Sequence, residues 1–124
     1  MASSYTTLLG LELPVQGELS GTWGDRVNAG ITNLLDTAIA GTTTWSTDAN
    51  ITLSTTTGAA NEARQAIILC SGARTVERTI TAPAASKTYV IINATTGSQS
   101  VKIVGVGPTT GVVIPTLSTA VVAW

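Results

Sequence analysis

The sequence contains no histidine, no phenylalanine and a single cysteine among its 124 residues. Without histidine, Ser-His and Cys-His catalytic pairs and imidazole ligation of a metal are excluded. One cysteine cannot form an internal disulfide, and Cys70 lies in an apolar stretch where a thiol packs as a small hydrophobe. We therefore expect a protein that is not an enzyme, with no catalytic residue, no cofactor and no bound metal.

Charge is also scarce, because Asp, Glu, Lys and Arg together make up 10% of the chain, against about 25% in an average protein. The six basic residues are dispersed, so no basic face is available to neutralise nucleic-acid phosphates. No apolar run approaches the length of about 20 residues that a membrane span requires, and the start does not resemble a secretory signal. A surface with so little charge favours burial against other subunits.

The acidic and aromatic residues show no pattern of a known site. Glycoside hydrolysis needs two carboxylates facing each other across a cleft, and the seven acids are scattered. The segment Asp48-Ala49-Asn50 lacks the remaining ligands of a calcium loop. Trp45 and Trp124 stand at strand ends, where a tryptophan either stacks on a sugar or packs in a core or interface. We favour packing for both.

The residues that are abundant indicate β-structure. Threonine makes up about a fifth of the chain, with many Val and Ile, and β-branched side chains fit a pleated sheet. Turn signals recur from residue 42 onward, and the pattern predicts strands over residues 51–55, 65–71, 76–81, 89–93, 100–104, 112–114 and 119–124. Residues 65–71 are continuously apolar, which is typical of a strand buried on both faces. We predict a small antiparallel β-sandwich or barrel over residues 42–124.

One amphipathic helix is predicted before the β-region, over residues 22–40. Apolar side chains recur there at spacings of three and four residues, Thr22 is a suitable N-cap, and Gly41 is placed to end the helix. Gly30 costs about 1 kcal/mol relative to alanine in a helix interior, so we interpret it as a point of close packing. Trp23 lies beside Gly21 and Gly24, which allows the large ring to approach another backbone.

Residues 8–15 precede the helix as an extended, apolar arm that includes Pro14. An isolated arm cannot bury these side chains, so it must dock on its own domain or on a neighbour. We divide the chain into residues 1–41, for attachment or oligomerisation, and residues 42–124, the β-module. The predicted docking surface combines arm and helix residues: Leu9, Leu11, Leu13, Trp23, Val27, Ile31, Leu34 and Leu35. The alternative is that the arm and helix only cover their own β-module.

A short motif at this position resembles a known family. Residues 21–25 read Gly-Thr-Trp-Gly-Asp, followed by Asn28 and preceded by Leu-Pro and a glycine. This arrangement is similar to the start of tail fibre and minor tail proteins of tailed bacteriophages, often cyanophages. Residues 57–61, 80–83 and 87–89 also look like the β-module that follows the helix in such proteins, so the resemblance covers most of the chain.

The resemblance implies a non-enzymatic structural protein of the virion, assembled in the host cytoplasm. It would form the base of a tail fibre or a baseplate-attached module, usually as a homotrimer bound to other tail proteins. Family members often continue beyond the position of Trp124, so we expect attachment more than direct adsorption to a host surface glycan. A capsid decoration (cement) protein and a glycan-binding adhesin remain as alternatives.

Overall fold

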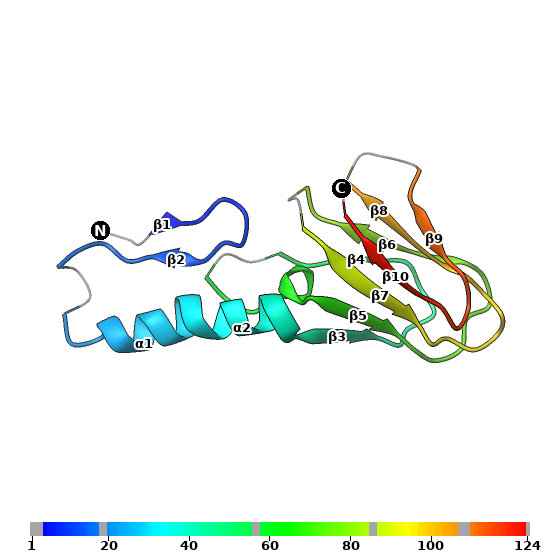
Figure 1. Ribbon diagram of the computed structural model, residues 1–124, viewed down its shortest axis with the longest axis horizontal. Helices are drawn as coiled ribbons and strands as arrows, with labels where there is room; N and C mark the ends of the chain where they lie inside the picture. Colours follow the sequence, from blue (N-terminus) through cyan, green and yellow to red (C-terminus); the bar gives the residue numbers. More distant parts are fainter. Residues whose placement is uncertain (1–3, 18–19, 56–57, 85–86, 107–109, 124) are drawn as a thin grey trace.

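A computed structural model describes residues 4–17, 20–55, 58–84, 87–106 and 110–123. Figure 1 shows two parts along the longest axis of the molecule. Residues 4–40 form a helix packed beside a short hairpin, which we call the helix–hairpin lobe. Residues 42–122 form the strands of the other part, which we call the coil module.

The predicted arm folds back on itself. Strand β1 (Ser4–Tyr5) pairs antiparallel with β2 (Glu12–Leu13). Gly10 permits the reversal, because its φ of 62° is left-handed backbone that favours glycine. The Thr6 amide also donates to the carbonyl of Leu11 at 2.8 Å. The prediction of an arm extended throughout residues 8–15 was therefore wrong. Residues 7–9 form the turn of the hairpin, and Glu12–Leu13 is the strand within the arm, paired with residues 4–5 that precede it.

The predicted helix is present, with an irregular centre. It consists of α1 (Trp23–Val27), a π-helical turn η1 (Asn28–Thr32) and α2 (Asn33–Ala40). Gly41 follows the last helical residue as predicted, but in an extended conformation with φ −76° and ψ 154°. A π turn accommodates an extra residue, so the apolar positions on its two sides do not follow one straight stripe.

Among its described residues, the coil module has eight short strands and one 3₁₀ turn. In chain order these are β3 (Thr42–Trp45), β4 (Ile51–Thr52), η2 (Glu62–Arg64), β5 (Ile67–Cys70), β6 (Arg78–Ala82), β7 (Tyr89–Asn93), β8 (Val101–Gly105), β9 (Val112–Ile114) and β10 (Thr119–Val122). Strand formation agrees with the β-branched composition, and the mainly β class is confirmed.

The strands wind alternately into two four-stranded sheets, ordered β10-β7-β5-β3 and β4-β6-β8-β9. Each turn of the chain adds one strand to each sheet, so β3, β5 and β7 are parallel neighbours, as are β4, β6 and β8. Strands β9 and β10 close the series with antiparallel pairs. This is the winding of a short β-solenoid. The predicted antiparallel arrangement was wrong, and the described strands close no barrel, because alternation fixes the inward face of a strand but not its partner's direction.

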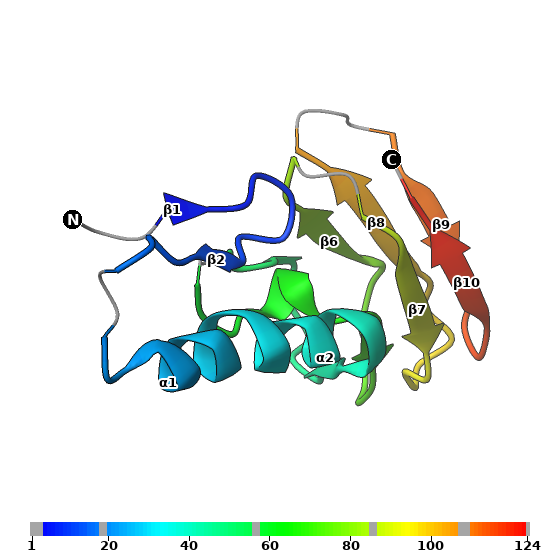
Figure 2. The ribbon, with the colours of Figure 1, turned by 60° about the vertical axis from the view of Figure 1, so that its left-hand side comes forward.

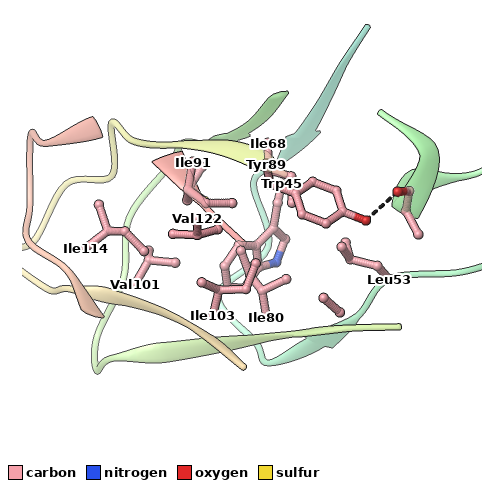
Figure 3. Packing of buried hydrophobic residues seen from close by; sticks show 13 residues of the cluster. Trp45, Leu53, Ile68, Ile80, Tyr89, Ile91, Val101, Ile103, Ile114 and Val122 are labelled. Carbon is pink, nitrogen blue, oxygen red and sulfur yellow. Dashed lines mark hydrogen bonds between the residues drawn. The ribbon is translucent and has the colours of Figure 1, made fainter. Parts of the chain in front are cut away.

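One apolar core lies between the sheets (Figure 3). Ile68, Tyr89 and Ile91 from one sheet and Ile80 and Val101 from the other are fully buried. Burial of each such side chain stabilises the fold by about 1.5–3 kcal/mol. Figure 3 shows the Tyr89 ring directed toward η2, where its hydroxyl donates to the carbonyl of Ala63. Burial raises the pKa of the Tyr89 phenol to about 12.

Two buried polar side chains fasten the ends of strands. Arg74, 2% exposed, donates to the carbonyl oxygens of Ser71 at 2.8 Å and Trp45 at 2.9 Å, and its guanidinium lies 4.6 Å from the centroid of the Trp45 ring. The Asn93 amide donates to the carbonyl of Ile114 at 3.0 Å. Trp45 is thus packed in the core, as predicted, whereas Trp124 lies outside the described residues.

Candidate functional site

The structure divides the predicted docking residues into three groups. Trp23, Leu13 and Leu35 are 60%, 47% and 36% exposed. The residues Leu9, Leu11, Val27 and Ile31 are half-buried, and Leu34 is buried. The helix therefore offers exposed apolar side chains in both α1 and α2, at Trp23 and Leu35, whereas Leu34 is already used within the chain.

Trp23 stands where α1 begins, at the end of the lobe away from the coil module (Figure 2). No residue of α1 is buried, and the turn around Trp23 is exposed in the described structure. A Cβ added at Gly21 or Gly24 would meet no atom within 4 Å. The predicted close approach of a second backbone beside these glycines is thus not made by the chain itself, and the space for it is open.

An ion pair between the buried Glu12 and the half-exposed Arg26 holds the hairpin against the helix. Glu12 is 3% exposed, and its Oε1 and Oε2 accept hydrogen bonds from Arg26 Nε at 2.9 and 3.1 Å. The hydrogen bond with Glu12 raises the pKa of Arg26. Gly30 allows this approach, because a Cβ there would lie 2.8 Å from the Glu12 Cβ. Close packing at Gly30 is confirmed, but the sequence contained no signal for the Glu12–Arg26 pair.

The tip of the hairpin docks on the coil module. Arg64, 3% exposed, donates to the carbonyls of Leu9 and Ala59, the latter at 3.1 Å. The Gly58 amide donates to the carbonyl of Gly10 at 2.7 Å. Burial lowers the pKa of Arg64. The hairpin tip thus docks on the chain's own coil module. This is the alternative interpretation of the arm, and for the hairpin tip the structure shows it.

A cavity of about 550 Å³ lies at this junction, between residues 6–10 of the hairpin and the η2 side of the coil module. Lys87 lines it, with its Nζ donating to the Gln65 carbonyl at 3.0 Å and lying 4.2 Å from the centroid of the Tyr89 ring. None of the described lining residues is acidic. Both lining cations donate to backbone carbonyls, Arg64 to that of Leu9 and Lys87 to that of Gln65, so they hold this junction together.

Cys70 is completely buried in β5, and burial raises the pKa of its thiol to about 11. The thiolate is therefore a fraction of about 10⁻³ at pH 8, since each pH unit below the pKa reduces it tenfold. We expect an aromatic disulfide reagent to react with Cys70 in urea and to react at least about a hundredfold more slowly in buffer. Equal rates in the two solvents, followed by absorbance, would contradict the buried placement.

Among the described residues, no group of three His, Cys, Asp or Glu side chains is placed to hold a metal ion. In the same residues, no helix combines the length and apolar character needed to cross a membrane. Comparison of the chain with protein-family models, curated proteins and solved structures finds no match.

Proposed function

We propose that this chain is a non-enzymatic structural protein of a tailed-phage virion, at the base of a tail fibre or on a baseplate. Copies of the chain associate with one another, with a homotrimer as the expected state, and attach to another tail protein. Residues 1–41 serve attachment, and residues 42–124 form a compact two-sheet sandwich that carries it. The resemblance of residues 21–25 to phage tail proteins supports the class, and the lobe supports the attachment.

The exposure of Trp23 is the observation that carries the proposal. An exposed tryptophan offers the largest apolar surface of any side chain, and tryptophan is enriched among residues that dominate binding energy. At 60% exposure on a helical turn without buried residues, most of the Trp23 side chain is left uncovered by the described residues of its own chain. A partner that covers the ring and the open glycines beside it gives this turn a function.

Glycan binding is less well supported by the arrangement of aromatic residues. Sugar sites use exposed aromatic rings on a sheet face or in loops, and both described aromatics of the coil module, Trp45 and Tyr89, are buried. Exposed rings among the described residues are Trp23 and Tyr5, which both belong to the lobe. Specific binding of the full chain on a glycan array would favour the adhesin alternative.

Trp23→Ala is expected to weaken attachment to the tail partner by at least about tenfold, because truncation of a central interface tryptophan costs about 2 kcal/mol or more. The melting temperature should stay within about 2 °C of the parent, since the ring contributes little to the fold. Val76→Ala is the matched control, because Val76 is also half exposed, at 50%, but lies in the coil module. Binding to purified tails, followed by sedimentation, measures both variants.

Unfolding of Trp23→Ala would show that the ring supports its own chain and would overturn the attachment proposal. The place in the virion is tested separately, with labelled antibody against the chain on intact particles. Label at the tail supports the proposal, and label over the capsid supports a decoration protein instead. Absence of label from both would reject a virion role.

A further inference from the structure

The outer face of the sheet β10-β7-β5-β3 is apolar, although it faces away from the core. Alternation along each strand places Ile68, Cys70 and Ile91 inward, where they are fully buried. The residues between them therefore point outward, and the register aligns them in rows across the four strands. One row is Thr42, Ile67, Val90 and Val121, and the other is Thr44, Leu69, Ile92 and Thr119.

These two rows, which we call the outer face, contain five aliphatic side chains, three threonines and no charge. Ile67, Leu69, Val90 and Ile92 are half-buried by their neighbours alone, and Val121 at the edge is 70% exposed. The corresponding outward residues of the other sheet are more polar: Thr52, Thr79, Thr81, Lys102, Val104 and Val113. The coil module is therefore amphipathic, with one sheet suited to burial and the other to water.

The sequence pattern of the central strands agrees with burial on both sides. Residues 67–70 and 89–92 are continuously apolar, as in strands that are covered on both faces. Within one chain the core covers only the inner face. Something else must cover the outer one, because contiguous exposed apolar surface marks interaction sites.

We infer that a second copy of this chain packs on the outer face. A face without charge meets an identical face without repulsion and without burying an unpaired charge. Two copies also share the same twist and row spacing, so the side chains can interdigitate as two sheets stacked about 10 Å apart. A charged peptide, a nucleic acid or an anionic surface finds no complementary group there.

The area of the outer face can be compared with the area that a stable protein interface buries. Four strands about 4.8 Å apart and four residues of about 3.3 Å rise give a flat footprint of about 250 Å². A stable complex buries about 800 Å² on each partner, with a dry apolar core inside a polar rim. The outer face fits the core of such an interface. Ile39, 76% exposed, and Leu117, 82% exposed, stand in the sequence just before the edge strands β3 and β10 of this sheet.

This inference rests on the self-association in the proposed function and assigns it to the coil module, with tail attachment left to the lobe. Two identical faces in contact form an isologous interface that closes with two copies, so a dimer, and not a homotrimer, is the mass expected from this face. The test is the mass of the full chain in solution, measured by sedimentation equilibrium over micromolar concentrations. Val90→Thr with Ile92→Thr keeps β-branched side chains on the strand but adds hydroxyls to the outer face. Val104→Thr with Val113→Thr makes the same change on the other sheet and is the control.

The outer-face pair should weaken self-association by at least about tenfold, which is about 1.4 kcal/mol, and the control pair should leave it unchanged. Circular dichroism and the melting temperature verify that both variants are folded. A parent chain that is monomeric throughout would overturn self-association itself. An oligomer that survives the outer-face pair but dissociates on Trp23→Ala would leave self-association intact and place it in the lobe. Growth into open-ended aggregates would indicate edge-to-edge pairing of β3 with β10 instead, and would also overturn the inference.

Discussion

Arg74→Met is expected to lower the free energy of unfolding by about 2–4 kcal/mol, because it removes buried donors and leaves their carbonyl acceptors in place. The Arg74 guanidinium is bonded to the carbonyls at the ends of β3 and β5, those of Trp45 and Ser71. Methionine has a similar length and still packs on Trp45, so the loss reports on the hydrogen bonds and on the contact between cation and ring, which contributes about 1 kcal/mol.

The magnitude follows from the asymmetry between making and breaking a buried bond. Replacing both partners by apolar groups can be neutral, whereas removing one leaves the other desolvated. In Arg74→Met the Ser71 carbonyl loses its guanidinium donor, whereas the Trp45 carbonyl keeps the Ser71 backbone amide at 3.0 Å. The substitution also removes the cost of burying the charged guanidinium, and this gain offsets part of the loss. Arg74 fastens two successive turns of the solenoid at the same end, so the whole coil module should unfold at lower denaturant concentration.

Arg78→Met is the control for loss of a positive charge. Arg78 is 25% exposed and its Nε donates to Asp48 at 2.7 Å, an arrangement worth about 1 kcal/mol or less at a surface. Urea unfolding followed by circular dichroism compares the two variants. If Arg74→Met costs no more than Arg78→Met, then Arg74 does not support the strand ends.

Gly30→Ala is expected to destabilise the helix–hairpin lobe by about 1–3 kcal/mol, as overpacking of a close contact does. The added Cβ would lie 2.8 Å from the Glu12 Cβ, and the buried Glu12 cannot retreat without breaking its ion pair with Arg26. The hairpin should therefore separate from the helix while the coil module stays folded. Amide hydrogen exchange should accelerate in residues 20–40 and remain unchanged in β5 to β8.

Gly24→Ala provides a control within the same helix. A Cβ at Gly24 meets nothing within 4 Å, so alanine should stabilise the helix by about 0.5–1 kcal/mol through propensity alone. Opposite signs for the two substitutions are the expected result. The same sign for both would mean that the hairpin does not pack on the helix at Gly30.

Local sequence pattern was sufficient for several features. The β-rich composition, the helix over residues 22–40, its end near Gly41 and the close packing at Gly30 were all predicted correctly. These features depend on propensity, periodicity and backbone sterics, which act over a few residues. The burial of Cys70 and Trp45 followed from their apolar surroundings in the same way.

The direction and partner of each strand were not determined by local pattern. The sequence pattern of an apolar strand is the same whether its neighbour is parallel or antiparallel. The parallel solenoid arises because the chain passes through the opposite sheet between two neighbouring strands. For the same reason the sequence could not show that Glu12 meets Arg26, that Arg64 reaches the hairpin or that Arg74 fastens the ends of β3 and β5.

The sequence by itself thus determined that the chain is rich in β-strands, contains one helix and has few charges to place on its surface. Only the tertiary structure decided which apolar residues remain uncovered. Leu34 is buried within its own chain while Trp23 is exposed, and the continuous apolar strands direct Leu69 and Ile92 outward. The physical reason is that an apolar side chain favours burial wherever it stands in the sequence, because burial removes it from water. Whether its own chain can bury it depends on how distant strands pair.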